Sequence, residues 1–270
     1  MTPPLIDSHC HLDLPHFDDD RDEVIARARE AGLVAIVTQG VDVPSSRKAV
    51  TLAERYDLVY AAVGIHPNDC ADFRPEMLDA IREMAAHPKV VAIGEIGLDD
   101  YWKTVPMVQQ RHVLRLQLDL AAALGLPVIL HHREAHEPIM VELRAWIKDR
   151  LPGTPLAQRP WAGVLHSFSG DLAMAQEAYD LGFILGLAGP VTFKNARDLH
   201  ALTAQLDPAR LMIETDAPYL SPHPYRGKRN EPARVRLVAE KLAELWGMPF
   251  AEVARLTTRT AERFFDLVKP

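Results

Sequence analysis

Short apolar runs rich in β-branched residues recur along the chain and alternate with longer amphipathic stretches. The apolar runs lie at residues 5–11, 33–40, 58–67, 90–99, 127–133, 162–170, 182–189 and 211–218. They are continuous rather than alternating, which is typical of parallel strands buried on both faces. Helical patterns fill the gaps, at residues 19–31, 43–55, 75–86, 107–124, 135–149, 171–181, 195–206 and 231–245.

Eight strand–helix units over about 250 residues predict an α/β fold of the (β/α)8 TIM-barrel type. We expect residues 1–270 to form a single domain, with an extra C-terminal helix at 250–266. The alternative is a doubly wound sheet, which usually has fewer strands and a glycine-rich turn after the first. Here the first apolar run ends in DSHCH, at residues 7–11, and not in glycines. The pattern therefore favours the barrel.

Composition narrows the functional classes. Apolar residues make up 48% and charged residues 25% of the 270 positions, which is ordinary for a globular protein and excludes a disordered chain. The net charge of −7 argues against a protein that coats duplex DNA through bulk positive charge. Any contact with nucleic acid must then come from a local basic patch.

The two cysteines, Cys10 and Cys70, are too few for a disulfide framework, and we expect both to be buried and reduced. The first residues contain no basic segment followed by an apolar one, as a secretion signal would. The apolar run at 121–130 is too short to span a bilayer, which takes about 20 residues. The sequence therefore predicts a cytoplasmic protein with no membrane segment.

Polar residues follow the buried runs where each strand is predicted to end, and barrel enzymes place their chemistry at those ends. They are His9, His11, His66, Glu95, His131, His132, His166, Glu214 and Asp216. A single histidine there is more often a satisfied core residue than a ligand. Several such groups converging on one mouth would carry a steep desolvation cost, which a cation would relieve. The pattern therefore predicts a metal centre.

Six ligands exceed what one catalytic ion normally takes, so we expect two ions bridged by a carboxylate. The first would lie on His9, His11, Glu95 and Asp216, and the second on Glu95, His131 and His166. Two ions about 3.5–4 Å apart would stabilise the attacking and leaving oxygens of a displacement. Imidazole ligands favour Zn, Mn, Fe or Ni over Mg, but the sequence does not distinguish these metals.

The expected catalytic groups are Glu95, as the bridge, and Asp216, which would hold an ion and accept a proton from water held by the metals. Basic residues near the mouth would bind substrate phosphates, with His66 as a further substrate contact; the basic set is Arg133, Arg226, Lys228 and Arg229. Three aromatic residues could stack on bases, namely Tyr101, Tyr219 and Tyr225.

Seven motifs together resemble the TatD family of metal-dependent deoxyribonucleases, within the amidohydrolase-type barrels. They are DSHCHLD (7–13), GIHP (64–67), IGEIGLD (93–99), PVILHHREA (127–135), GVLHSFSG (163–170), ETDAPYL (214–220) and RGKRNEP (226–232). The resemblance implies a divalent-metal hydrolase of phosphodiesters, often a 3′→5′ exonuclease on DNA. It also implies the same six metal ligands.

The sequence departs from the family pattern at His132, Ser167, Asp100 and the longer stretch 151–161, which we place at the rim and which leave substrate preference open. Two other functions compete with the nuclease. One is an amide or ester hydrolase (aminoacyl or lactone) of the amidohydrolase type, although many of those carry a metal-bridging lysine where Glu95 stands. The other is a binding protein without activity, which would not need an open metal pair.

Overall fold

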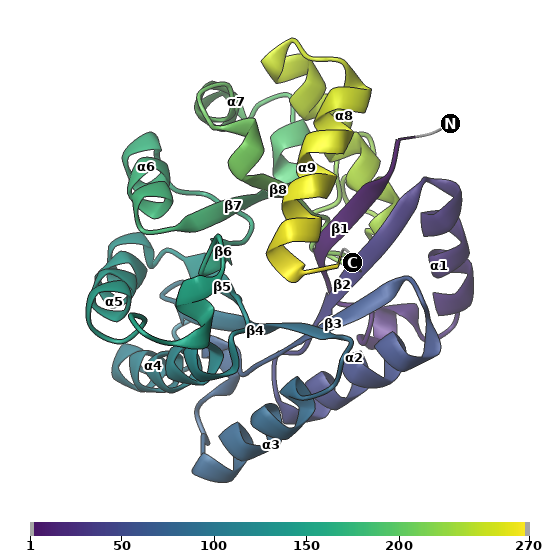
Figure 1. Ribbon diagram of the computed structural model, residues 1–270. Helices are drawn as coiled ribbons and strands as arrows, with labels where there is room; N and C mark the ends of the chain where they lie inside the picture. The colour runs from purple at the N-terminus through teal and green to yellow at the C-terminus, as the bar shows by residue number, and fades with distance from the viewer. Residues whose placement is uncertain (1–2, 268–270) are drawn as a thin grey trace.

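The computed structural model describes residues 3–267 and confirms the barrel. Eight parallel strands follow one another in the order β1 to β8, and the helices surround them (Figure 1). The strands are β1 (Leu5–Cys10), β2 (Leu33–Gln39), β3 (Val59–Val63), β4 (Val90–Asp99), β5 (Val128–Arg133), β6 (Gly163–Leu165), β7 (Phe183–Leu187) and β8 (Leu211–Ile213). The α-helices are α1 (Arg21–Glu30), α2 (Val43–Arg55), α3 (Pro75–Ala85), α4 (Met107–Leu124), α5 (His136–Asp149), α6 (Leu172–Asp180), α7 (Arg197–Thr203), α8 (Val235–Trp246) and α9 (Phe250–Phe265).

Local sequence accounts for several helix ends. At the start of α2, Asp42 accepts a hydrogen bond from the backbone of Ser45 at 2.7 Å, and the two residues form a capping box. Helices α4 and α8 stop at Gly125 and Gly247, whose φ angles of 70° and 62° lie in the left-handed region that glycine adopts most readily.

The apolar side chains form two clusters separated by the ring of strands. One lies between the strands and the surrounding helices, and the other fills the inside of the barrel. Ile6, Ile129, Val164 and Met212 belong to the inner cluster. Phe264 of α9 packs against them, so the extra C-terminal helix closes the barrel at the end where the strands begin. This apolar layer supports the polar groups that follow on the same strands.

Barrel closure depends on the segment after β8, because β8 itself ends at Ile213. Asp216 donates its backbone N–H to the His9 carbonyl at 2.9 Å, and His11 donates to the Ala217 carbonyl at 2.7 Å. Asp7 accepts hydrogen bonds from the Thr215 hydroxyl at 2.6 Å and the Thr215 backbone at 2.9 Å. Burial raises the pKa of Asp7 well above its usual range, although these hydrogen bonds oppose the shift.

Two expectations from the sequence need correction. The stretch 151–161 does not lie at the rim; it includes a short 3-10 helix, Pro155–Gln158, and Arg159 donates to the Phe264 carbonyl at the opposite end of the barrel. It precedes β6, and segments that precede a strand lie where the strand starts. His132 does not face the mouth either, because it alternates with His131 and lies between Phe168 and His136.

Both cysteines are free and buried, as expected. Within residues 3–267, none of the helices combines the length and the apolar character needed to cross a bilayer.

Candidate metal centre

Glu95, near the middle of β4, is the centre of the site and divides its two oxygens between two groups of histidines. Oε2 lies 3.3 Å from His9 Nε2 and 3.5 Å from His11 Nε2. Oε1 lies 2.9 Å from His131 Nδ1 and 3.0 Å from His166 Nε2. One carboxylate therefore faces two sets of ring nitrogens that come from opposite sides of the barrel.

Asp216 completes the first group. Its Oδ1 lies 3.4 Å from His11 Nε2 and 3.6 Å from His9 Nε2. The side chain of Asp216 is 15% exposed, whereas that of Glu95 is 4% exposed, so Asp216 lies closer to the open side of the site. The structure thus brings together all six residues that the sequence singled out as metal ligands.

Irregular pairing in two strands is what turns these side chains inward. Strict alternation from Ile6, which faces the barrel interior, would place Cys10 inside and His9 outside. The register between β1 and β2 shifts between Asp7 and Cys10, and Cys10 instead joins the outer cluster. The pairing of β4 with β5 shifts in the same way between Ile93 and Ile96, around Glu95. Irregularities of this kind commonly re-aim side chains next to active sites.

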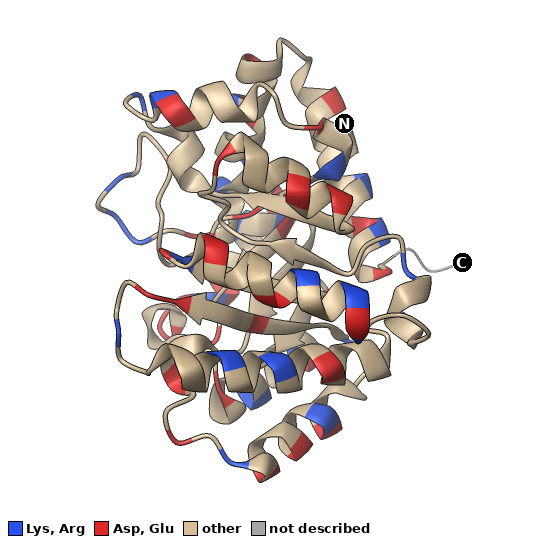
Figure 2. Cartoon of the chain, turned by 90° about the vertical axis from the view of Figure 1, so that its left-hand side faces the viewer, with Lys and Arg blue, Asp and Glu red and all other residues tan. Residues whose placement is uncertain are grey.

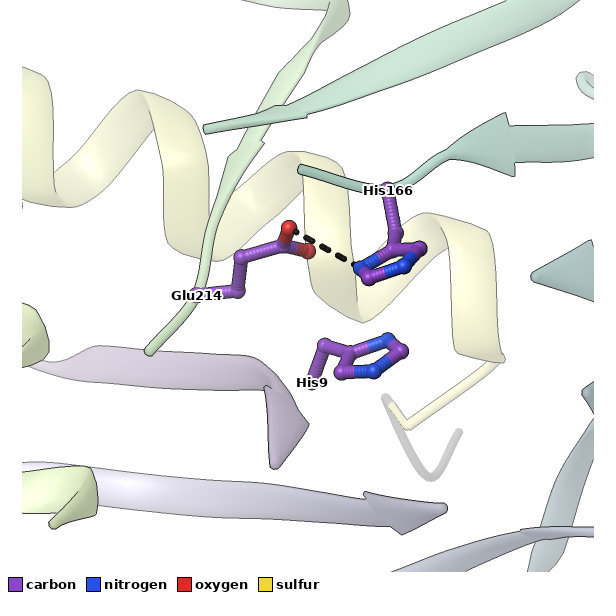
Figure 3. Close-up of side chains that lie close together, drawn as sticks. All are labelled: His9, His166 and Glu214. Atoms are coloured by element: carbon purple, nitrogen blue, oxygen red, sulfur yellow. Dashed lines mark ion pairs between the residues drawn. The ribbon is translucent and has the colours of Figure 1, made fainter. Parts of the chain in front are cut away.

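Carboxylates on the far side of two rings, one in a hydrogen bond and one at ion-pair distance, define which nitrogen faces Glu95. His131 Nε2 lies 3.0 Å from Asp99 Oδ2, and an ionised carboxylate can only accept, so Nε2 carries the proton and Nδ1 is free as a ligand. His166 Nδ1 lies 3.5 Å from Glu214 Oε1 (Figure 3), and its Nε2 lies toward Glu95. Carboxylate partners of this kind orient metal-binding histidines in many proteins.

His66 differs from the other histidines of the site. Its Nε2 lies 3.5 Å from Glu95 Oε1, close enough to count it with the second group. However, its Nδ1 accepts a hydrogen bond from the Asn68 backbone at 3.1 Å, so in the neutral ring the proton is on Nε2. A protonated Nε2 donates and cannot ligate a metal. This geometry suits the predicted substrate contact better than a ligand role.

The charges of the site are coupled. Burial acts to raise the pKa of Glu95, but His166, His9 and His66 outweigh it and hold that pKa well below its usual range. Burial, followed by the neighbouring His166, lowers the pKa of His9. The rings of His9 and His166 are stacked, with centroids 3.9 Å apart (Figure 3). Burial acts to lower the pKa of His166, but Glu95 and Glu214 raise it well above its usual value. A divalent cation bound here would therefore displace a proton from His166 and coordinate the ionised Glu95 beside the neutral His9 ring.

The unpartnered atoms support the same conclusion. Neither ring nitrogen of His9 has a hydrogen-bond partner among the described residues, although the ring is completely buried; the contact of Nε2 with Glu95 lacks hydrogen-bond alignment. Buried polar atoms without partners are rare and need an explanation. A divalent cation between Glu95 and the histidines would satisfy Nε2, so the residues present fit a metal.

The basic residues expected at the mouth have different surroundings. Arg133 places its guanidinium 3.8 Å from the centroid of the Tyr101 ring, and Arg226 lies 4.1 Å from that of Phe193. Lys228 is exposed, whereas Arg229 is held by Asp20 through two contacts of 2.7 and 2.6 Å. Figure 2 shows basic segments on loops that project at the left of the view, between helices that carry both signs of charge. Their contact with substrate stays a prediction.

Sequence reasoning missed Asp99 and left Glu214 without a role. Both are buried, at 1% exposure, and each orients one histidine of the site. A signal for Asp99 was present, because Glu95, Gly97 and Asp99 alternate along one face of β4. For Glu214 the useful signal was its position two residues after Met212, which faces the barrel interior.

A barrel of eight parallel strands with a buried carboxylate between two sets of histidines defines the class of metal-dependent barrel hydrolases. The model of one family, TatD related DNase, matches residues 6–266, and the chain belongs to this family. It is therefore an enzyme that hydrolyses ester bonds with the help of metal ions.

Individual relatives agree with this assignment. The chain is 42% identical over 263 residues to the uncharacterized metal-dependent hydrolase YabD of Bacillus subtilis, covering 97% of this chain and 99% of the relative. It is 35% identical over 269 residues to the 3′-5′ ssDNA/RNA exonuclease TatD of Salmonella typhimurium, covering 98% and 100%. The crystal structure of YJJV, a TatD homolog from Escherichia coli K12, superposes with a TM-score of 0.89 at 33% identity, covering 98% and 99%.

Proposed function

We propose that this protein is a 3′→5′ exonuclease that removes nucleotides from single-stranded DNA, with two divalent metal ions in its centre. The observation that carries the proposal is the division of the two Glu95 oxygens between His9 and His11 on one side and His131 and His166 on the other. A bridging carboxylate of this kind suits two ions at the separation that phosphodiester hydrolysis uses. The name of the Salmonella relative supports the substrate and the direction.

When bound, the ions would lower the pKa of water and offset the charge that develops on the phosphate oxygens. The chain supplies the surroundings for this chemistry. Glu95 stays ionised, because neighbouring histidines hold its pKa well below its usual range. Burial acts to raise the pKa of Asp216, but the hydrogen bond and charge of His11 lower it, so the Asp216 carboxylate stays ionised and can both hold an ion and accept a proton. His66 Nε2–H points toward the same site and can donate to a phosphate oxygen or a leaving group.

The proposed partner is thus nucleic acid, bound through a local basic rim of Arg133, Arg226 and Lys228 rather than through net charge. We also propose a cytoplasmic location, which the two free, buried cysteines support, since thiols persist in reducing compartments.

The test is digestion of DNA labelled at either end, single-stranded or duplex, with EDTA or with added Mn²⁺, Mg²⁺ or Zn²⁺. We expect a ladder that shortens from the 3′ end of single strands and disappears with EDTA. Parallel assays with a phosphodiester chromogen, an amide and an ester cover the competing amidohydrolase activity. Hydrolysis of the amide or ester without cleavage of any phosphodiester would contradict the proposal.

A further inference from the structure

Two neighbouring aromatic rings stand in solvent on the loop between β4 and α4. Tyr101 is 45% exposed and Trp102 is 58% exposed. The other tryptophans of the chain are less accessible: Trp146 and Trp161 are 4% and 9% exposed, and Trp246 is half-buried, with its indole donating to the Thr203 carbonyl. Large aromatic residues normally contribute stability through burial, so an exposed adjacent pair points to a binding role.

The loop that carries these rings is held in place by hydrogen bonds. Asp99 Oδ1 accepts the backbone N–H groups of Tyr101 at 2.9 Å and Trp102 at 3.0 Å. Asp100 donates its backbone N–H to the Arg133 carbonyl at 2.9 Å, and the Thr104 hydroxyl bonds to Asn68 at 3.1 Å. These contacts fix the backbone that carries the two rings, which reduces the entropy lost when a ligand binds.

The same carboxylate connects the aromatic pair to the metal centre. Asp99 binds the loop through Oδ1 and His131 through Oδ2, at 3.0 Å, and His131 Nδ1 faces Glu95. The aromatic rings and the proposed reacting position thus share one hydrogen-bonded support. The aromatic pair also follows directly on β4, the strand that carries Glu95.

A positive charge accompanies the rings. Arg133 holds its guanidinium 3.8 Å from the Tyr101 ring centroid and 5.4 Å from that of Trp102, and its side chain is exposed. Aromatic faces next to a guanidinium match a nucleobase joined to a phosphate, since bases stack on aromatic rings and Arg binds phosphate. In a blunt duplex the faces of internal bases are covered by their neighbours, so this surface selects unpaired bases.

We propose that Tyr101, Trp102 and Arg133 form a subsite that stacks an unpaired nucleobase of the strand being cut. This inference rests on the proposed nuclease function and adds the element that would make the enzyme select single strands. Charge complementarity between Arg133 and the strand, and the shared support of Asp99, favour this occupant over a protein partner.

The fluorescence of Trp102 provides a direct test in the metal-loaded protein. Phosphorothioate-linked oligothymidylate, which resists hydrolysis, is compared with a blunt duplex and an abasic oligomer of the same length. We expect the single strand to quench the exposed tryptophan emission and the other two to leave it nearly unchanged.

Trp102→Ala should weaken binding of the single strand by about tenfold or more, as expected for loss of one stacked base. Trp102→Phe, which keeps a ring, should bind within about threefold of the unaltered protein by the same stacking argument.

Trp246→Phe is the matched control, because this residue ends α8 on the side of the barrel where the strands begin. It should keep both the affinity and the quenching. The subsite would be overturned if Trp102→Ala binds the single strand as tightly as the unaltered protein does. It would also be overturned if the unaltered protein binds the single strand without quenching. Either result would count against the subsite even if the protein degrades DNA. Quenching in a protein that cleaves no DNA would contradict the nuclease function and leave the subsite standing. A Trp102 signal that depends on protein concentration without oligonucleotide would indicate an interface between two copies and would overturn the proposal.

Discussion

Asp99 Oδ2 lies 3.0 Å from His131 Nε2, and this contact determines that Nδ1 of His131 faces Glu95. Asp99 is buried, and Asn68 and the backbone of residues 101 and 102 donate to it as well. The burial of Asp99 acts to raise its pKa, but these donors hold the pKa well below its usual range, so it remains an acceptor. Asp99, which lies outside the set of expected metal ligands, thereby fixes the tautomer of His131, which belongs to that set.

Asp99→Asn should weaken metal binding, because an amide can donate to His131 and favour the wrong tautomer. We expect a loss of about 10–100-fold in affinity for the ion next to His131, as found when carboxylate partners of metal-binding histidines are changed. Calorimetric titration with Zn²⁺ or Mn²⁺ measures this directly. Asp119→Asn, on the surface and paired with Arg150, is the matched control. Unaltered affinity in Asp99→Asn would contradict the positioning role.

Glu95→Gln should remove the bridge between the two groups of histidines. An amide offers one neutral acceptor oxygen, so we expect the bound metal to fall from two ions per chain to one or none and activity to fall by about 10³-fold or more. Elemental analysis after dialysis counts the ions. Glu240→Gln, on the exposed side of α8, should behave like the unaltered protein. Two ions per chain in Glu95→Gln would exclude Glu95 as the bridge.

Asp216→Asn should lower kcat by about 10²–10⁴-fold, the usual contribution of a positioned acid or base. The fold should remain, because the contact of Asp216 with His9 that closes the barrel uses backbone atoms. Circular dichroism and thermal unfolding check the fold, and single-turnover cleavage of labelled DNA measures the rate. Full turnover in this variant would defeat the assignment of Asp216 as ligand and proton acceptor.

Asp69 should make the metal-free protein less stable as the pH rises. Burial, followed by Asp42 and Glu95, raises the pKa of Asp69 to about 6, above its usual value. The folded state then binds the proton more tightly, so this contribution to stability is present below pH 4 and is lost as the pH rises through about 6. The side chain is 46% exposed, so solvent screening limits the effect to about 1 kcal/mol or less.

Asp69→Asn removes this dependence. Urea unfolding in EDTA should show the variant gaining stability over the unaltered protein between pH 4 and pH 7. Asp72→Asn, at an exposed position three residues further on, is the control. If the free energies of unfolding of the Asp69 variant and the unaltered protein differ by the same amount across this pH range, the titration of Asp69 is ruled out.

Alanine substitutions of the neighbouring residues Lys228 and Arg229 should have different effects, one on DNA binding and the other on stability. Lys228→Ala should leave stability unchanged and reduce the slope of log affinity for single-stranded DNA against log salt by about one phosphate contact. Arg229→Ala should instead cost about 1 kcal/mol of stability, because it breaks the paired contacts with Asp20. Chemical unfolding and salt-dependent binding separate the two effects. Identical behaviour of the two variants would contradict the different roles assigned to Lys228 and Arg229.

The sequence alone determined the class of fold and the identity of the six residues of the candidate metal centre, Glu95 among them. Buried parallel strands need continuous apolar runs, and polar residues at their ends are costly unless they have a function, so both leave a clear trace in the order of residues. Only the tertiary structure decided that His9 and Glu95 face inward, because register shifts in β1 and β4 override simple alternation. The tertiary structure likewise decided that Asp99 orients His131, that Arg229 forms an ion pair with Asp20, and that the 151–161 stretch lies far from the mouth of the barrel. These features depend on pairing between strands and on contacts between distant segments, which local patterns do not encode.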